Sequence, residues 1–179
     1  MSCDAFQQLL DMSQLIREEA APVPATQQKI KDWHGAAVSI LGTRCVISAD
    51  ETRRIVDVPE TIPVPGVKPW VRGIANIGGR VVAISDLSSY LSGGNRKSQG
   101  RQALIVNGRG IHTGLLIDEC FGGIRLSSEE LRTDRNVAQE LSAFVRGVFA
   151  TEDGDYALFD TNRLLTNADF AQAGVITSS

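Results

Sequence analysis

Two aspartates lie at matching positions of a segment that occurs twice in the sequence. At a constant offset of 74 residues and without a gap, six of 21 aligned positions are identical. The identical pairs are Val71 and Val145, Arg72 and Arg146, Gly73 and Gly147, Ala83 and Ala157, Asp86 and Asp160, and Leu91 and Leu165. Paired carboxylates such as Asp86 and Asp160 can perform general acid and base catalysis when they face one pocket.

A structural role for the two aspartates fits their surroundings better. Each follows an apolar run and precedes a short segment of helical character, "DLSSYL" and "DTNRLL". An aspartate at such a place caps a helix, because its carboxylate accepts the free backbone N–H groups of the first turn. Capping predicts that each side chain turns onto its own helix start, whereas catalysis predicts a deep pocket between the two aspartates.

The remaining residue types form no complete catalytic or ligand-binding constellation. His34 and His112 have no partner at metal-ligand spacing, and Ser85 lacks the Gly-x-Ser-x-Gly elbow of a nucleophile. The glycines of "GIANIGGR" and "GRGIHTG" match neither a phosphate loop nor a dinucleotide fingerprint. Three cysteines far apart in the sequence predict isolated, reduced thiols: Cys3, Cys45 and Cys120. We therefore predict a protein that is not an enzyme and has neither a metal nor a cofactor.

Composition and charge restrict the class of partner. The chain has 179 residues, 42% of them apolar, a formal net charge of −3 and a pI near 5.4, so it supplies no basic field for nucleic acid. The arginines at positions 53, 54, 72 and 80 are expected to be solvated at the surface. No apolar run is long enough to cross a bilayer, and the N-terminus does not resemble a signal peptide, so we expect a cytoplasmic protein without membrane insertion.

The elements that must position these residues fall into two regions. Residues 4–19 carry a wide apolar stripe at helical spacing behind Asp4, which predicts an N-terminal amphipathic helix. A connector with two prolines follows it, so residues 1–32 are expected to be an appendage to a domain over residues 33–179.

The main domain has the pattern of short strands joined by tight turns. Hairpins are predicted over residues 36–49, 102–118 and 145–159, a crossing loop over the proline-rich residues 59–69, and a capped helical turn after Ser127. A repeat that occurs only twice indicates two similar subdomains, each a small barrel of short strands.

The stretch "PGVKPWVRGIANIGGRVVAISDL" resembles the signature of the CheW-like chemotaxis coupling proteins. The residues that carry the match are Pro65, Gly66, Gly73, Ile74, Asn76, Ile77, Gly79, Val81, Val82, Ile84, Asp86 and Leu87, and the likeness extends from about Trp33 to Leu165. It implies an all-β fold of two intertwined five-stranded β-barrels with short helices and no enzymatic activity.

The resemblance also implies partners. Members of this family hold the regulatory domain of a CheA-type histidine kinase beside a chemoreceptor, with strands of the first barrel facing the kinase and a groove between the barrels facing the receptor. Within the family, the N-terminal region and "PGVKPWVRG" are most similar to adaptors of twitching-motility systems that control type IV pili. A small barrel that binds a ligand or single-stranded nucleic acid is the alternative, and it would need aromatic platforms in a basic groove.

Two positions depart from the family pattern. Gly78 stands where the family has arginine, and Arg54 stands where it has glutamate. Both positions lie on family surfaces implicated in partner contacts, so the departures predict either a different choice of partner or loss of the receptor contact. The resemblance places the partner interface at Thr52, Arg54, Val56, Gly73, Asn76 and Gly78.

Overall fold

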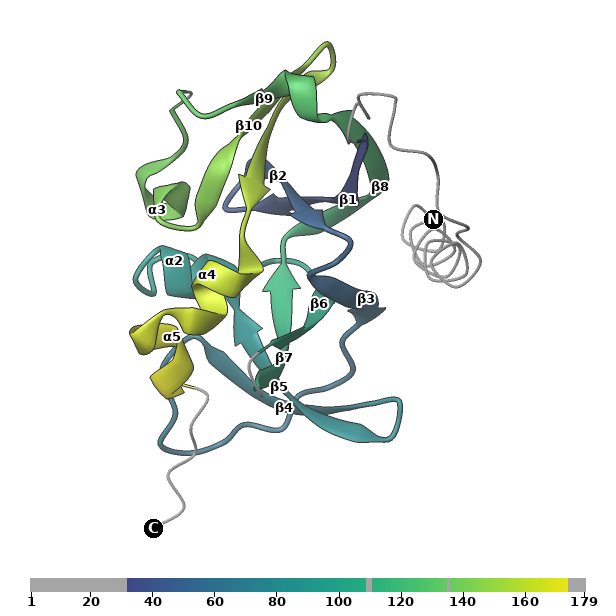
Figure 1. The fold of residues 1–179 in the computed structure, drawn as a ribbon. Coiled ribbons are helices and arrows are strands. Elements are labelled where there is room, and N and C mark those ends of the chain that lie inside the picture. Colours follow the sequence, from purple (N-terminus) through teal and green to yellow (C-terminus); the bar gives the residue numbers. More distant parts are fainter. Residues whose placement is uncertain (1–31, 109–110, 135, 174–179) are drawn as a thin grey trace.

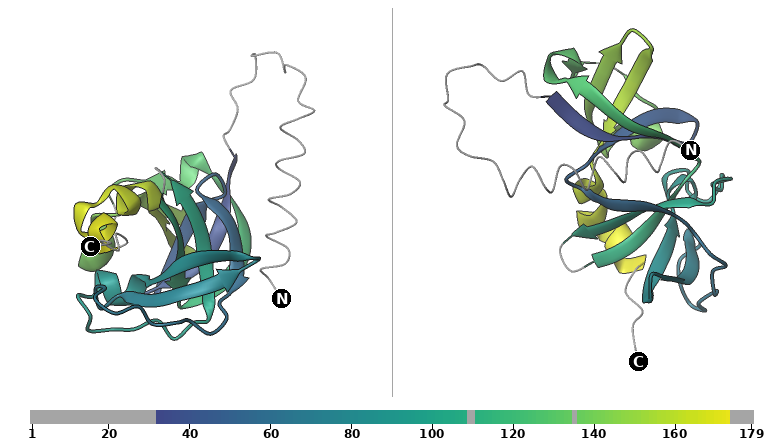
Figure 2. Two further views of the ribbon diagram at one scale, coloured as in Figure 1. Left: turned by 90° about the horizontal axis from the view of Figure 1, so that it is seen from below. Right: turned by 90° about the vertical axis from the view of Figure 1, so that its right-hand side faces the viewer.

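The computed structural model describes residues 32–108, 111–134 and 136–173, and it is mostly β-structure in two stacked halves (Figures 1 and 2). Each half is built on one mixed sheet, and short helices lie along one side. The predicted N-terminal helix lies outside the described residues. Among the described residues, no helix is long and apolar enough to cross a membrane.

A six-stranded sheet forms the half that contains both the first and the last strand of the described chain. Its strand order is β8-β1-β2-β11-β10-β9, and every pairing is antiparallel except that of β2 with β11. The strands are β1 (Asp32–Ile40), β2 (Thr43–Ser48), β8 (Glu119–Ser127), β9 (Leu131–Arg132), β10 (Val145–Thr151) and β11 (Gly154–Phe159).

A five-stranded sheet forms the other half, with the order β3-β6-β7-β5-β4 and one parallel pairing, β5 with β7. The strands are β3 (Thr52–Asp57), β4 (Val71–Ile77), β5 (Arg80–Asp86), β6 (Gln102–Gly108) and β7 (Ile111–Ile117). Because the chain enters this half after β2 and returns to the first half with β8, the two halves are intertwined, as the resemblance implied.

The helices are short and follow strand ends. They are α2 (Leu87–Leu91), the 3-10 turn η1 (Ser128–Glu130), α3 (Gln139–Ser142), α4 (Thr161–Thr166) and α5 (Ala168–Ala173). Helices α2, α4 and α5 gather on the same side of the molecule (Figures 1 and 2).

The prediction of two closed five-stranded barrels is correct only in part. The backbone hydrogen bonds among described residues leave both sheets open, and one of the sheets has six strands. In the five-stranded sheet the edge strands β3 and β4 approach each other through side chains, since Val56 packs with Ala75 and Ile77 in one apolar cluster. The helices also make the fold mostly β instead of all-β.

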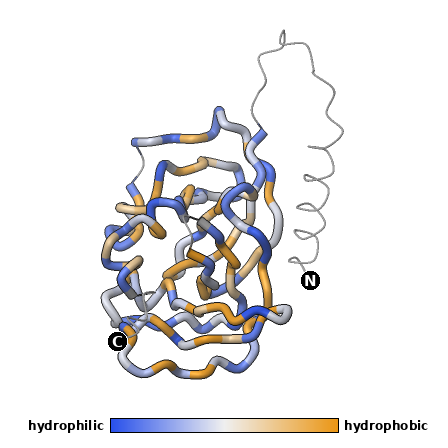
Figure 3. The backbone as a smooth tube through the Cα atoms, turned by 60° about the horizontal axis from the view of Figure 1, so that its bottom comes forward, coloured by the Kyte–Doolittle hydropathy of each residue, from blue (hydrophilic) through white to orange (hydrophobic). Residues whose placement is uncertain are grey.

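Three apolar cores hold the fold. One lies within the five-stranded sheet, and one lies within the six-stranded sheet around Phe149 and Leu158. The third and largest lies between the halves, where strands of both sheets meet α2, α4 and α5. Hydrophobic and hydrophilic stretches alternate along the described chain (Figure 3).

Most of the local predictions are confirmed. The three hairpins are present, residues 58–70 contain no strand beyond one bridge between Ile62 and Ile74, and Ser127 with Glu130 forms a complete capping box. Cys45 is a free thiol, and burial raises its pKa to about 12. Cys120 is disulfide-bonded, so the expectation of isolated reduced thiols is wrong for that residue.

Candidate functional site

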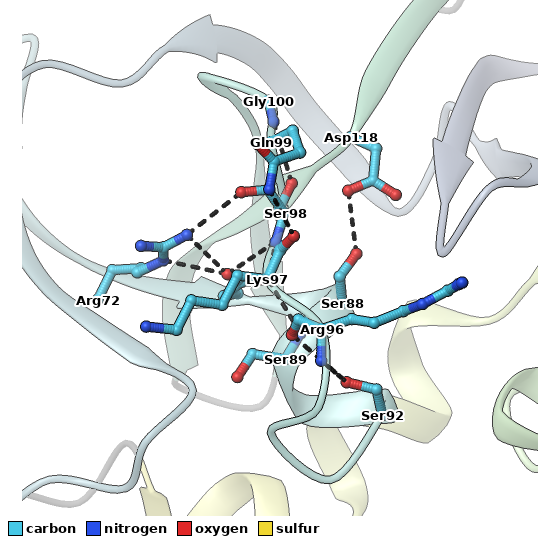
Figure 4. A network of polar contacts seen from close by, with 11 residues as sticks. Arg72, Ser88, Ser89, Ser92, Arg96, Lys97, Ser98, Gln99, Gly100 and Asp118 are labelled. Atoms are coloured by element: carbon cyan, nitrogen blue, oxygen red, sulfur yellow. Dashed lines mark hydrogen bonds and ion pairs between the residues drawn. The ribbon is translucent and has the colours of Figure 1, made fainter.

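Asp86 caps α2 and also holds the loop that follows this helix. Its fully buried carboxylate accepts hydrogen bonds from the backbone N–H of Ser89 and of Ser98, at 3.0 and 3.1 Å. Nε of Arg72 donates to the same carboxylate at 3.0 Å, and Arg72 also reaches the carbonyl oxygen of Ser98 (Figure 4). Three groups of the protein itself therefore compensate the negative charge of Asp86.

Asp160 makes the equivalent contacts in the second half. Its carboxylate accepts from the backbone N–H of Arg163 and from Nε of Arg146, and Glu51 also pairs with Arg146. Burial alone would raise the pKa of Asp160, but the hydrogen bonds from Arg146 and Arg163 outweigh it and hold this pKa below its usual value. The same contact raises the pKa of Arg146.

The repeated Val-Arg-Gly segment explains why both arginines point at their aspartates. The strand register shifts between Val71 and Gly73, and it shifts again between Val145 and Gly147. A β-bulge re-aims the side chain at the extra residue, which here is the arginine. The prediction of two capping aspartates is confirmed, whereas the expectation that Arg72 is simply solvated is wrong, because its guanidinium is bound to Asp86.

The six predicted interface residues lie on β3, on β4 and in the turn after β4, so they belong to the two edge strands of the five-stranded sheet, and they differ in accessibility. Asn76 and Gly78 are exposed, and Arg54 and Val56 are half-buried. Thr52 is 3% exposed and Gly73 is buried, so neither presents a side chain at the surface. A Cβ atom at Gly73 would lie 2.1 Å from the carbonyl oxygen of Ile62, which gives this glycine a packing role.

Gly78 and Gly79 form the turn between β4 and β5, as the glycine pair predicted. Their φ angles of 60° and 82° belong to the left-handed region, and Oδ1 of Asn76 accepts from the backbone N–H of Gly79. Two residues with positive φ match the right-handed twist of the strands that they join. The side chain of Arg54 reaches this turn from β3 and lies directly over Gly78.

An exposed apolar surface lies beside this turn. Val81 is 68% exposed and Ile62 is 65% exposed. Val81 pairs with Asn76, and Ile62 forms a bridge with Ile74, so all four side chains lie on one face of the sheet because alternate residues of a strand share a face. We call the surface formed by Ile62, Ile74 and Val81 the strand patch.

A groove between the two halves is the second accessible surface. It has a volume of about 350 Å³ and an aromatic floor in which Tyr90 lies 5.0 Å from Trp70 and 6.1 Å from Phe144, between ring centroids. Its lining consists of Lys68, Trp70, Tyr90, Leu91, Glu140, Phe144, Asp169 and Gln172. Burial and then the nearby charge of Asp169 raise the pKa of Tyr90. We call this surface the aromatic groove.

Sequence reasoning located neither the strand patch nor the residues of the aromatic groove. One signal was present, because Trp70 and Phe144 are separated by the same offset as the two aspartates. Both precede the Val-Arg-Gly segment, and their carbonyl oxygens accept from the backbone N–H of Asp86 and Asp160, each at 2.7 Å. An alignment by identity misses this pair because tryptophan and phenylalanine differ.

No group of three or more described His, Cys, Asp or Glu side chains could hold a metal ion. Two accessible features of the described chain are the strand patch with the adjoining turn, and the aromatic groove. Both present apolar or aromatic side chains with charged residues at the rim, which is the composition of protein-binding surfaces.

Comparisons with known proteins agree with this geometry. The family model for the CheW-like domain matches residues 34–169. Protein PilI of Pseudomonas aeruginosa is 32% identical over 177 residues, which cover 95% of this chain and 96% of that protein. Chemotaxis protein CheW of Thermotoga maritima is 18% identical over 136 residues, covering 76% of this chain and 89% of that protein.

A solved structure has the same fold. The scaffolding protein TtCheW from Thermoanaerobacter tengcongensis matches with a TM-score of 0.61 and 20% identity, over 72% of this chain and 89% of that one. The family match over residues 34–169 and the identity to PilI confirm the resemblance found in the sequence. The chain belongs to the family of CheW-like domain proteins, the scaffolding adaptors of chemosensory signalling.

Proposed function

We propose that this protein couples a CheA-type histidine kinase to a chemoreceptor in a cytoplasmic system that controls type IV pili. The identity to PilI over 95% of the chain supports the link to pili. The observation that carries the coupling function is the position of the two surfaces. In Figures 1 and 2 the tip of the β4–β5 hairpin lies on one side of the molecule, and the helices beside the aromatic groove lie on the other.

The strand patch is the surface that we assign to the regulatory domain of the kinase. Ile62 and Val81 are the two most exposed of the large apolar side chains among the described residues and share one face of the sheet, as in an apolar patch that marks a binding surface, and the turn at Gly78 borders it. We expect a modest interface with the kinase, near or below about 1,200 Å² in total. Repetition of such contacts in an array would supply the cooperativity.

The aromatic groove is the surface that we assign to the receptor. A helix docks in a groove by placing apolar side chains from successive turns on the floor, and here Trp70, Tyr90 and Phe144 form that floor. Lys68, Glu140 and Asp169 also line the groove, and they provide charges of both signs that can fix the orientation of the helix.

In this proposal the adaptor transfers the signal by positioning its partners and catalyses no reaction. CheW-like proteins are non-catalytic, and both aspartates are occupied by capping and ion pairs. A receptor that moves or reorients its helix shifts the population of kinase arrangements that the adaptor holds. No phosphoryl group needs to touch this protein.

Binding to the regulatory domain of a CheA-type kinase tests the proposal. Isothermal titration of the purified proteins is expected to give a dissociation constant in the micromolar range or tighter. Val81→Asp is expected to weaken binding at least tenfold, because it places a charge in an apolar contact. Phe121→Asp is the matched control, since Phe121 is also an exposed apolar residue but lies on β8 of the other sheet. No association at tens of micromolar, where an established coupler binds, would refute the proposal.

The alternative of a ligand- or nucleic-acid-binding barrel has less support. The interiors of both sheets are filled by apolar side chains, Ile84 and Ile105 in one and Val46 and Phe149 in the other. A salt-sensitive mobility shift of a single-stranded oligonucleotide would revive this alternative.

A further inference from the structure

Arg54 holds a charged group at the gap between the two edge strands of the five-stranded sheet. It lies on β3, and its guanidinium ends over the turn that follows β4. The neighbouring pairs Arg54–Ile105 and Val56–Ala103 put its stem on the face that carries the inner core of this sheet. Arg54 therefore covers the open end of a core that the backbone leaves unclosed.

The guanidinium of Arg54 is not neutralised by the rest of the described chain. It makes no hydrogen bond or ion pair with any other described residue, in contrast to Arg72 and Arg146, which both contact aspartates. The side chain is nevertheless half-buried. A guanidinium presents up to five donors in a fixed, planar arrangement, which suits the bidentate geometry of a carboxylate, the group that an acidic side chain of a protein partner offers.

Gly78 is what makes room for this arrangement. A Cβ atom at position 78 would lie 3.1 Å from one terminal nitrogen of Arg54 and 3.6 Å from the other. The glycine also has a φ angle of 60°, which residues with a side chain rarely adopt. Arginine at 54 and glycine at 78 are therefore neighbours in one arrangement, in which the glycine leaves space for the terminal nitrogens of the guanidinium at the turn.

We propose that Arg54, seated on Gly78, is a specificity-determining residue that receives a carboxylate side chain of the kinase regulatory domain. This inference rests on the function proposed above. It assigns the contact to the kinase because Arg54 belongs to the strand-patch end of the molecule, opposite the helices of the aromatic groove (Figure 1). The bidentate pair would orient the kinase domain, and a cationic group on a competing partner would be rejected by repulsion.

The seating of Arg54 on Gly78 is tested first, without any partner. Gly78→Ala is expected to lower the urea midpoint of unfolding in the wild-type background, because the new methyl group is strained and presses on the guanidinium. The same substitution in an Arg54→Ala background is expected to lower the midpoint by a clearly smaller amount. An equal fall of the urea midpoint in the two backgrounds would show that positions 54 and 78 are independent. It would overturn the proposed coupling between Arg54 and Gly78.

The carboxylate contact is tested by titrating the kinase regulatory domain with variants that keep their native circular dichroism. Arg54→Glu is expected to weaken binding more than 100-fold, Arg54→Ala about tenfold or more, and Arg54→Lys by an intermediate amount. Arg53→Glu is the control, because Arg53 is the exposed neighbour on the same strand and its replacement changes the net charge equally. That variant is expected to stay within about threefold of the wild type.

The outcomes separate this inference from the proposed function. If the wild type fails to bind the kinase domain, the proposed function itself is wrong. If the wild type binds and Arg54→Glu behaves like Arg53→Glu, only the role of Arg54 is overturned. If Arg54→Glu loses binding to a receptor fragment and keeps binding to the kinase domain, the assignment to the kinase is overturned.

Discussion

At the scale of single residues, the repeated Asp and Arg form two copies of one structural device. In each copy the aspartate caps a helix through its carboxylate, takes a hydrogen bond from the arginine fourteen positions earlier, and donates its own backbone N–H to the residue that precedes Val-Arg-Gly. A device that occurs in both halves and uses all its polar groups internally is structural. It holds α2 and α4 at the ends of β5 and β11.

Removal of either carboxylate is expected to destabilise the fold. Asp86→Ala eliminates the cap of α2 and leaves the backbone N–H of Ser98 without its acceptor, which costs roughly 2–4 kcal/mol in the free energy of unfolding. Urea denaturation followed by circular dichroism measures this loss. Asp134→Ala, at an exposed aspartate, is the control and is expected to change stability by less than about 0.5 kcal/mol. A loss no greater than that of the control would refute the capping account.

The lowered pKa of Asp160 predicts how stability depends on pH. Because its folded-state pKa lies below the unfolded value, Asp160 stabilises the fold fully above about pH 4, and this contribution is lost as the pH falls through the folded-state pKa. Asp160→Asn is therefore expected to be less stable than the wild type at pH 7. The deficit should shrink steadily in urea titrations from pH 5 to pH 2.5, and a deficit independent of pH would contradict the ion-pair account.

At the scale of elements, turns and strands were predictable wherever the chain specifies its own geometry. The hairpin at Gly78-Gly79, the capping box after Ser127 and the crossing loop all follow from local residue types, and each is present. The sheet partners were not predictable, because the parallel pairings of β2 with β11 and β5 with β7 join segments that are distant in sequence. The prediction of closed barrels was wrong for the same reason, because closure depends on whether the two edge strands of a sheet come together.

The predictions for the candidate site divide in the same way, between what local residue types specify and what depends on the rest of the chain. The sequence pointed to positions 54, 76 and 78 through the family signature, and the structure brings these residues to one end of the sheet. The family signature did not separate accessible residues from buried ones, so the predicted interface included Thr52 and Gly73, although both are buried. Exposure of Val81 and Ile62 depends on what the rest of the chain leaves uncovered, which no local pattern records.

Two glycines of the β4–β5 hairpin are expected to differ in their tolerance of a side chain. Gly79→Ala meets open space and should cost only the strain of its left-handed conformation, about 1–2 kcal/mol. Gly73→Ala would drive its Cβ into the carbonyl oxygen of Ile62 and displace the crossing loop from β4, so it should cost distinctly more. Thermal unfolding of the two variants makes the comparison, and equal losses would show that residues 62–63 are not packed on Gly73.

At the scale of the whole molecule, the central feature is that one intertwined chain holds the tip of the β4–β5 hairpin and the helices α2, α4 and α5 on different sides (Figures 1 and 2). The large apolar core between the halves fixes the position of the aromatic groove relative to the five-stranded sheet, because β1, β2 and α4 contribute to it together with β6 and β7. Under the proposed function, a partner that moves in the groove would therefore change the position of the strand patch.

Substitution at the rim of the aromatic groove is expected to separate the two binding activities. Gln172 is exposed at this rim, so Gln172→Arg adds bulk and charge without disturbing a core. Its affinity for a receptor signalling fragment should fall at least fivefold, while its affinity for the kinase regulatory domain stays within about twofold of the wild type. Biolayer interferometry with each partner in turn gives both values, and an equal loss for both partners would place them on one surface.

The account is tested most directly by native mass spectrometry of this protein mixed with the kinase regulatory domain and a receptor signalling fragment. Two surfaces on opposite sides predict a ternary complex that contains all three chains. Val81→Asp should remove only the kinase domain from it, and Gln172→Arg should remove only the receptor fragment. Mutually exclusive binding, with the two binary complexes present and no ternary mass at saturating concentrations, would contradict the account.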